Sequence, residues 1–250
     1  MSAPLKDALR RIAYGALDIF WPRVCPLCGG KSDRENRHIC SSCMAKIEWY
    51  ESGGSCSVCE TPIATEADHA FVCAACKTSH PAYEYSRSAT IYSFPLDEAI
   101  RTFKYNNGTW LTNDLVDILE GTLKSKLSYS EIDCVVPVPL HRARFQSRGY
   151  NQSELLASEL ARRIDRRIDS TSFVRERNTP QQARLSLEER IKNVEGAFRV
   201  EKKDMIRGRT ILLVDDVTTS MSTLNYCAKA LKEAEAKAVW CLTLARRREG

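Results

Sequence analysis

The chain has 250 residues, 43% of them hydrophobic, and a formal net charge of +5. This length suits one medium domain with a small one, and the composition is ordinary for a globular protein. No apolar run approaches the roughly 20 residues that a membrane helix needs. Charged residues such as Lys6, Arg10 and Arg11 argue against a secretory signal, so we expect a cytoplasmic protein.

Residues 1–20 form the first predicted element, an amphipathic helix. Leu5, Leu9, Ile12 and Ile19 recur near helical spacing. A helix that packs on its own protein explains this pattern better than a membrane contact does.

Residues 21–80 have little hydrophobic periodicity but contain four C-x-x-C pairs. In a cytoplasmic chain such pairs favour metal thiolates over disulfides, and two pairs complete one tetrahedral zinc site. Four redox motifs within fifty residues would be unusual. We therefore expect two structural zinc sites, with these ligands: Cys25, Cys28, Cys40, Cys43, Cys56, Cys59, Cys73 and Cys76.

The order in which the cysteine pairs combine is open. Loop closure favours sequential over interleaved pairing by only about 0.8 kcal/mol per site. His38 and His80 lie near the cysteines, but eight thiolates already fill two sites. The other three cysteines stand in apolar stretches, so we expect core residues at Cys134, Cys227 and Cys241.

From residue 85 onward, apolar strands alternate with helices. Strands are expected at 89–93, 132–138, 210–214 and 238–244, and helices at 96–105, 111–126, 152–168 and 222–235. Continuously apolar strands are typical of a parallel sheet that is covered by helices on both faces. The sequence therefore predicts an α/β domain over residues 85–250.

The stretch from Ile211 to Thr223 carries the strongest functional signal. An apolar strand runs into two adjacent acids, then into hydroxyl residues and a helix. Backbone N–H groups at a helix start and hydroxyl donors suit a phosphate, and the acids suit ribose hydroxyls or a magnesium shell. The candidate binding residues are Asp215, Asp216, Thr218, Thr219, Ser220, Ser222 and Thr223. An ordinary capped helix with solvated acids is the alternative.

Two further segments support a phosphate site. The stretch after Pro139 holds Arg142, Arg144 and Arg148 with no acid among them, which suits a diphosphate unless it is merely a solvated loop. His141, in the same stretch, is more plausibly structural than a catalytic base. Residues 175–193 form a long polar connection, which we expect to be a lid over the site rather than a simple exposed loop.

Together these segments resemble the ComF family, whose members are described as amidophosphoribosyltransferase-like competence proteins. The cysteine pairs are similar to that family's double zinc ribbon. Further similar motifs are FKY at 103–105, VPVPL at 136–140, RGYNQ at 148–152, T-x-x-Q at 179–182, R-x-x-N at 190–193, AF at 197–198 and VDDV at 214–217.

The resemblance implies a type I phosphoribosyltransferase fold that binds phosphoribosyl diphosphate with magnesium. The acids of VDDV would hold the ribose hydroxyls, and the hydroxyl residues after them would cradle the sugar phosphate. The diphosphate would contact Val138, Pro139 and the basic stretch that follows them, and Asn151 and Gln152 are further candidate binding residues. The catalytic candidates are Arg148, Arg177 and Arg184. The family is linked to DNA uptake in natural transformation.

The expected reaction is transfer of the phosphoribosyl group to a nitrogen nucleophile, but the sequence leaves turnover open. A sensor of phosphoribosyl diphosphate or a nucleotide, or a single-stranded DNA-binding accessory of DNA-uptake proteins, are the alternatives. Met221 stands where the family's phosphate loop has glycine. If that position needs positive φ, methionine weakens the site, and if it needs only helical angles, binding is retained.

Overall fold

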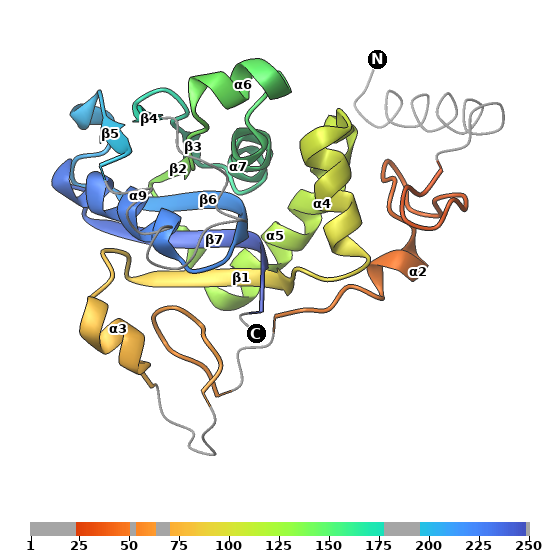
Figure 1. Cartoon of the computed structure of the whole chain (residues 1–250), viewed down its shortest axis with the longest axis horizontal. Coiled ribbons are helices and arrows are strands. Elements are labelled where there is room, and N and C mark those ends of the chain that lie inside the picture. The colour runs from red at the N-terminus through yellow and green to blue at the C-terminus, as the bar shows by residue number, and fades with distance from the viewer. Residues whose placement is uncertain (1–23, 51–53, 64–70, 178–195, 249–250) are drawn as a thin grey trace, which may run out of the picture.

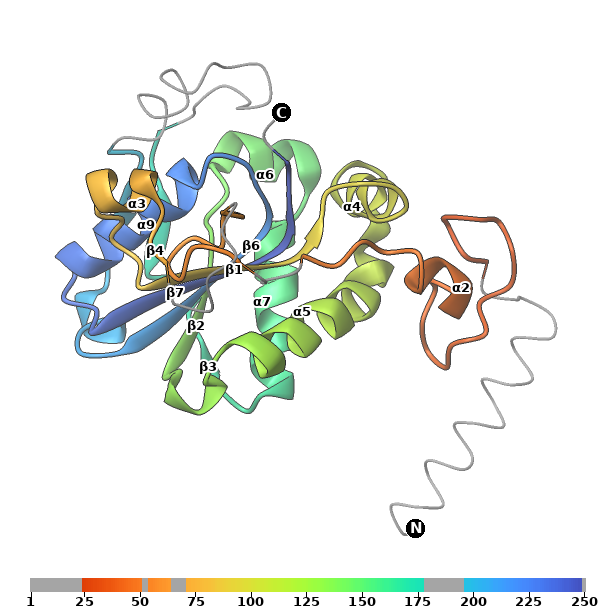
Figure 2. The ribbon, with the colours of Figure 1, turned by 90° about the horizontal axis from the view of Figure 1, so that it is seen from below.

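The computed structural model describes residues 24–50, 54–63, 71–177 and 196–248 (Figures 1 and 2). The N-terminal helix expected at 1–20 and most of the expected lid, including Arg184, lie outside the described residues.

The centre of the molecule is a five-stranded, all-parallel sheet in the order β1-β7-β6-β2-β3. The strands are β1 (Tyr85–Ile91), β2 (Cys134–Pro137), β3 (Arg167–Ile168), β6 (Thr210–Thr218) and β7 (Ala238–Arg246). β6 and β7 are buried along almost their whole length, as their apolar sequences predict. The α/β expectation is confirmed.

Helices cover both faces of this sheet. Alternate residues of β6 separate the two cores: Leu212 and Val214 pack with α4 (Leu96–Tyr105), α5 (Thr112–Lys126) and α7 (Gln152–Arg163). Ile211 and Leu213 pack on the opposite face with α9 (Ser222–Glu233). The second core also contains the three cysteines expected there, Cys134, Cys227 and Cys241, each at most 1% exposed.

The remaining elements are short. They are α2 (Ser41–Met44), α3 (Ala74–Ser79), α6 (Arg142–Arg148), the antiparallel pair β4 (Phe173–Arg175) and β5 (Phe198–Val200), and the 3₁₀ turns η1 (Gly108–Leu111), η2 (Tyr129–Glu131) and η4 (Lys203–Met205). None of the described helices is long and apolar enough to cross a membrane.

Three sequence-based boundaries were wrong by four or five residues, and one segment was assigned to the wrong type of structure. The strand expected at 89–93 begins at Tyr85, and the strand expected to end at 214 continues to Thr218. The helix expected at 152–168 ends at Arg163, because Asp165 takes a left-handed φ of 52° and turns the chain into β3. The expected basic loop after Pro139 is instead α6, which begins where His141 Nδ1 accepts the Ala143 N–H at 3.2 Å.

The cysteines form two closed groups. The four sulfur atoms of Cys25, Cys28, Cys40 and Cys43 lie within 4.8 Å of one another, and those of Cys56, Cys59, Cys73 and Cys76 do the same. Sequential pairing is therefore confirmed. Four mutually close thiols match the tetrahedral all-cysteine set of structural zinc, and each group is consistent with one such site.

Each cysteine group belongs to a module that packs on a different part of the α/β domain; the first module holds Cys25 to Cys43 and the second Cys56 to Cys76. The second module is held against β1 and β7: Arg246 donates to Cys59 O at 2.7 Å, and the buried carboxylate of Glu60 accepts the Ser88 N–H at 2.7 Å. The segment between the modules pairs with β1, because the Tyr50 N–H donates to Ala89 O and the Ile91 N–H to Glu48 O. This segment covers the edge of the sheet that β1 would otherwise expose.

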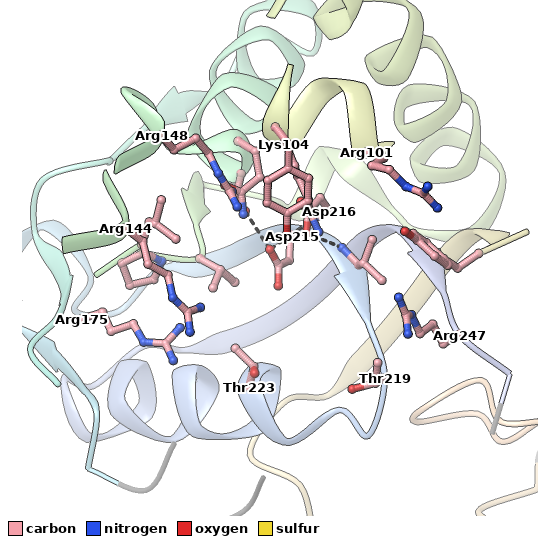
Figure 3. Close-up of a pocket in the computed structure, with 18 residues that line it drawn as sticks. Arg101, Lys104, Arg144, Arg148, Arg175, Asp215, Asp216, Thr219, Thr223 and Arg247 are labelled. Atoms are coloured by element: carbon pink, nitrogen blue, oxygen red, sulfur yellow. Dashed lines mark hydrogen bonds and ion pairs between the residues drawn. The ribbon is translucent and has the colours of Figure 1, made fainter. Parts of the chain in front are cut away.

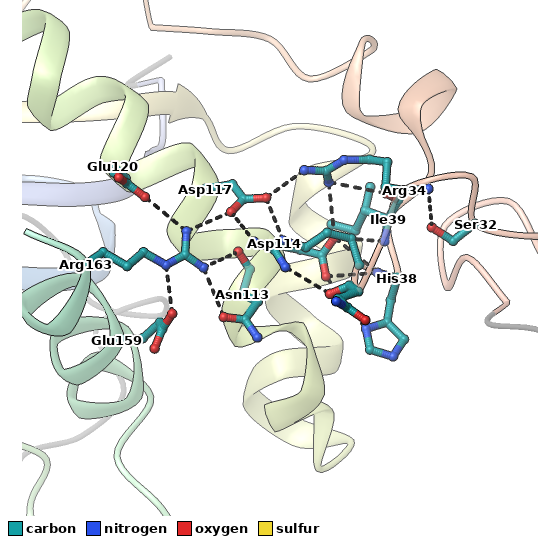
Figure 4. A network of polar contacts seen from close by, with 12 residues as sticks. Ser32, Arg34, His38, Ile39, Asn113, Asp114, Asp117, Glu120, Glu159 and Arg163 are labelled. Carbon is teal, nitrogen blue, oxygen red and sulfur yellow. Dashed lines mark hydrogen bonds and ion pairs between the residues drawn. The ribbon is translucent and has the colours of Figure 1, made fainter. Parts of the chain in front are cut away.

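The first module is joined to α5 and α7 by a network that we name the ribbon clamp (Figure 4). Asp114 is fully buried and accepts the backbone N–H groups of His38 and Ile39, each at 3.0 Å. The other members are Arg34, Arg37, Asp117, Glu120, Glu159 and Arg163. Every carboxylate of the clamp is within ion-pair distance of a guanidinium group.

Candidate functional site

A cleft of about 470 Å³ opens at the carboxyl ends of β2 and β6 (Figure 3). This is where the ligands of parallel α/β sheets usually bind. Eight of the residues that the sequence nominates line it: Val138, Pro139, Arg148, Gln152, Asp215, Asp216, Thr219 and Thr223. Segments about seventy residues apart in the chain thus meet at one edge of the sheet.

Five other described nominees are not among the cleft-lining residues. Thr218 is buried, with its Oγ1 3.4 Å from Met221 Sδ. The hydroxyls of Ser220 and Ser222 lie 3.0 Å from each other. Asn151 caps α7, because its side chain accepts the Ser153 N–H and donates to Val138 O, both at 3.1 Å. Arg177 is exposed and does not line the cleft.

The two acids lie near the carboxyl end of β6, and both are buried. Asp215 Oδ1 accepts the Ser153 hydroxyl at 2.7 Å and the Asp216 N–H at 2.9 Å. Asp216 Oδ2 lies 2.9 Å from Lys104 Nζ. Burial, and then the negative charge of Asp216, raises the pKa of Asp215 to about 7. Both acids are buried because β6 continues past them to Thr218.

Lys104 remains cationic despite its burial. Burial lowers the pKa of Lys104, but the carboxylates of Asp216 and Asp215 more than reverse that effect, and the net shift is upward. The FKY motif had drawn attention to this position without giving it a role. Lys104 reaches the acids because α4 ends beside the carboxyl end of β6. No local pattern in the sequence indicates that these two elements end side by side.

The cleft carries a large excess of positive charge. Its two carboxylates face six cationic side chains, those of Arg101, Lys104, Arg144, Arg148, Arg175 and Arg247. Burial and then the neighbouring Arg148 lower the pKa of Arg144, and burial and then Arg144 lower the pKa of Arg175. Since each guanidinium destabilises the charged form of its neighbour, a bound anion would relieve the repulsion, and the arrangement favours an anionic ligand.

Of these cations, the sequence nominated Arg148 as catalytic and placed Arg144 in the basic stretch. Arg101 and Lys104 were missed, although a spacing of three residues puts both on one face of α4. Arg247 was also missed, because it follows the closing strand β7 and has no local motif. Its backbone N–H donates to Thr218 O at 3.0 Å, at the start of the loop of residues 219–221 that joins β6 to α9 and corresponds to the family's phosphate loop.

The backbone angle at Met221 resolves the question left open by the sequence. Met221 has φ 59° and ψ −3°, a left-handed conformation that glycine adopts more easily. The position thus has the positive φ for which methionine was expected to weaken the site. The methionine nevertheless adopts this angle, so its cost is backbone strain and not a different loop conformation. Its side chain is buried, and its sulfur lies 3.4 Å from Thr218 Oγ1 and 3.5 Å from Ser86 Oγ. The side chain is packed below the loop, while Thr219 and Thr223 line the cleft above it.

Two arginines at the end of α7, Arg162 and Arg163, are ion-paired and therefore contribute little to a basic surface for single-stranded DNA. Arg163 contacts Asp117, Glu120 and Glu159 within the ribbon clamp. Arg162 contacts Glu159 at 2.7 Å. These charges are balanced locally, whereas Arg144, Arg148 and Arg175 point into the cleft (Figure 3).

Two family models match the chain. A double zinc ribbon domain matches residues 16–82, and a phosphoribosyl transferase domain matches residues 150–250. The first match spans both cysteine groups, and the second spans β6, α9 and the two acids. The order of the two modules is the one expected from the sequence.

Several bacterial proteins are similar to this chain over most of their length. Competence protein F of Haemophilus influenzae is 29% identical over 226 residues, which is 89% of this chain and 96% of that protein. The DNA utilization protein YhgH of Escherichia coli K12 is 31% identical over 222 residues, 82% of this chain and 94% of that protein. Competence protein ComFC of Bacillus subtilis is 28% identical over 220 residues, covering 85% and 86%.

Proposed function

This chain belongs to the ComF family, which joins a double zinc ribbon to a phosphoribosyltransferase domain, and we propose that its cleft binds phosphoribosyl diphosphate with magnesium. The observation that carries this proposal is the charge of the cleft. Six cationic side chains surround two buried carboxylates, next to hydroxyl residues and the start of α9. A sugar that carries a phosphate and a diphosphate needs both kinds of group.

The arrangement of the cleft suggests how the ligand lies. Thr219 and Thr223 stand on the side of the α9 N-terminus, where backbone N–H groups and the helix dipole favour the sugar phosphate (Figure 3). Arg144, Arg148 and Arg175 stand on the other side, where their guanidinium groups favour the diphosphate. Asp215 and Asp216, between the two, accept the ribose hydroxyls.

Magnesium fits the donor set of this site. Mg²⁺ prefers carboxylate and phosphate oxygens, and Asp215 and Asp216 supply the carboxylates that would hold it together with the ligand. Its chemistry when bound is to neutralise charge on the diphosphate. Lys104, paired with Asp216, keeps a second positive charge at the same place.

The proposed reaction is transfer of the phosphoribosyl group to a nitrogen nucleophile. The bond from the anomeric carbon to diphosphate breaks, and its electron pair leaves with the diphosphate. The nitrogen lone pair forms the new bond, and the proton of that nitrogen is released to water. The arginines of the cleft stabilise the negative charge that develops on the leaving group. We propose that this activity serves DNA uptake or utilization, as the names of the relatives suggest.

Calorimetric titration of the zinc-loaded protein with phosphoribosyl diphosphate tests the proposal. We expect saturable binding that magnesium strengthens and that the double variant Asp215→Asn/Asp216→Asn weakens by at least about tenfold. The control is Asp165→Asn, a change of an exposed acid whose left-handed φ asparagine also tolerates. Absence of binding, or equal binding by the double variant, would overturn the proposal.

A second measurement separates an enzyme from a sensor. Diphosphate release is followed after addition of nucleobases and amines to the saturated protein. Release that depends on an acceptor supports transfer. Binding without release from any acceptor supports the sensor alternative.

A further inference from the structure

A second cavity, of about 820 Å³, adjoins the cleft. It lies between the segment that joins the two cysteine modules, the second module at residues 61–62, and the carboxyl ends of β1 and β7. We name it the linker cavity. Arg247 lines both the linker cavity and the cleft, and its N–H bond to Thr218 O fixes it at the start of the phosphate loop. A ligand in the linker cavity would therefore lie beside the sugar.

The walls of the linker cavity suit a planar aromatic ring. Trp49 is 48% exposed there, whereas Tyr50, Ile47 and Ile91 are buried around it. An indole that is only half covered loses contact with water when a second ring stacks on it. The backbone of Trp49 and of its neighbours pairs with β1, so the main chain that carries the indole is fixed in the absence of a ligand.

The charge of the linker cavity suits an anionic ligand. Three consecutive arginines, Arg246 to Arg248, face the one carboxylate of Glu48. Arg246 is engaged with Cys59 O at 2.7 Å and Thr61 Oγ1 at 2.8 Å, and Arg248 pairs with Glu48. Arg247 stacks on Tyr92, with its guanidinium carbon 4.6 Å from the ring centroid. With one carboxylate against three guanidinium groups, the cavity keeps a positive excess.

We propose that the linker cavity is the acceptor site, and that it takes a planar aromatic compound with an anionic substituent and a nitrogen nucleophile. The inference rests on the proposed function, since it needs phosphoribosyl diphosphate in the cleft. It also gives the cysteine-containing region a part in the site, because Trp49 comes from the segment between the two modules and Thr61 from the second module.

Matched pairs of probes test this proposal on the full zinc-loaded chain saturated with phosphoribosyl diphosphate and magnesium. Orotate, nicotinate and anthranilate carry a carboxylate, and uracil, nicotinamide and aniline are the corresponding rings without it. We expect at least one carboxylated probe to bind, about tenfold or more tightly than its partner. Trp49→Ala should weaken that binding about tenfold or more, and Trp49→Phe should restore most of it.

The control variant is Trp110→Ala, which removes another half-exposed tryptophan, 41% exposed, whose ring lies 4.6 Å from the His38 ring at an angle of 60°, outside both cavities. It should leave probe binding unchanged, and Trp49→Ala should leave the affinity for phosphoribosyl diphosphate unchanged. If phosphoribosyl diphosphate binds but no carboxylated probe does, or if Trp49→Ala binds the probe as the wild type does, the acceptor proposal is overturned alone. If phosphoribosyl diphosphate itself does not bind, the proposed function is overturned and the acceptor proposal with it.

Discussion

The ribbon clamp and the cleft are both built from arginines and aspartates, but they differ in how those charges are matched. In the clamp, Arg34, Arg37 and Arg163 face four carboxylates, and each carboxylate has a guanidinium partner. In the cleft, six cations face only two carboxylates, so even complete pairing would leave an excess of positive charge. The same residue types thus hold the first cysteine module against α5 and α7 in one place and line the proposed anion-binding site in the other.

The pKa shifts follow this difference. Burial raises the pKa of Asp117, but hydrogen bonds from Arg37 and Arg163 lower it further, so the net shift is downward. At Asp215 burial and the adjacent Asp216 prevail, and the pKa rises. The clamp therefore stabilises the charged state of its carboxylate, whereas the surroundings of Asp215 in the cleft favour its neutral form.

Loss of a zinc ligand should have the largest effect, because it removes the module on which the clamp depends. We expect Cys40→Ser to lower the free energy of unfolding by about 5 kcal/mol or more. Metal analysis should show about one zinc per chain instead of the two expected from the two cysteine groups. Cys227→Ala, a change of a buried cysteine outside the groups, should keep two zinc ions. Unchanged zinc content in Cys40→Ser would contradict the assignment.

Breaking the clamp should cost stability without affecting the ligand. Asp114→Asn leaves the buried side chain with the same shape but without the charge that faces Arg34 and two backbone N–H groups. We expect a loss of about 3 kcal/mol in chemical unfolding. The affinity for phosphoribosyl diphosphate should stay within about twofold of wild type, by the independence of distant sites. A large loss of affinity would mean that the clamp and the cleft are not separate.

Removing a cation from the cleft should have the opposite effects, a loss of ligand affinity with little change in stability. Arg148→Ala should weaken binding of phosphoribosyl diphosphate by about 2 kcal/mol, roughly thirtyfold, because one charge-assisted contact is lost. The unfolding free energy should change by less than about 0.5 kcal/mol. Arg142→Ala is the matched control on the same helix, since Arg142 is exposed and does not line the cleft. Equal losses in both variants would indicate a diffuse electrostatic effect instead of a site.

The pH dependence of stability should have opposite signs at the two places. The lowered pKa of Asp117 stabilises the protein above its unfolded value of 3.8, and this contribution is lost as the pH falls through the lowered folded value. Asp117→Asn should therefore cost about 1 to 2 kcal/mol at pH 7 and little near pH 3.

The raised pKa of Asp215 has the contrary consequence. Between pH 3.8 and about 7 only the unfolded state ionises, so this group lowers stability over that range, and Asp215→Asn should be more stable than wild type at pH 8 and about equal to it below pH 4. Unfolding curves of both variants across this range check the prediction. Parallel curves for Asp117→Asn and Asp215→Asn would contradict the contrast between clamp and cleft.

Among changes at the candidate binding segment, the smallest effect on binding is expected at Met221. Its backbone already has the left-handed angle, so Met221→Gly should change the affinity for phosphoribosyl diphosphate by less than about threefold. The variant should lose about 1 to 2 kcal/mol of stability, because the lost burial exceeds the relief of backbone strain. A large gain in affinity would show that methionine impairs the phosphate loop.

The sequence predicted the features that depend on neighbours in the chain. The apolar runs gave the parallel strands, the spacing of the cysteines gave both metal groups, and the step from β6 into α9 placed Asp215, Asp216, Thr219 and Thr223. In each case the physical cause is local: side-chain alternation, a tight turn, or a strand that leads into a helix.

The features that were missed depend on tertiary packing. Lys104 reaches Asp216, and Arg247 reaches the phosphate loop, only because α4 and β7 end beside β6. The stretch after Pro139 was read as a loop because seven residues show no helical periodicity, although a histidine cap and a terminal Gly149 with φ 86° define α6. The clamp was also missed, since residues about eighty positions apart form it.

Thermal unfolding with and without phosphoribosyl diphosphate and magnesium tests the central claim most directly, because a ligand stabilises only the fold that binds it. The account predicts that the ligand raises the melting temperature of the wild type and of the clamp variant Asp117→Asn by the same amount, although the variant starts lower. It predicts a smaller rise for Arg148→Ala, which starts near the wild type, because that variant binds the ligand roughly thirtyfold more weakly. An equal rise in Arg148→Ala, or no rise in the wild type, would contradict the assignment of the cleft as the ligand site.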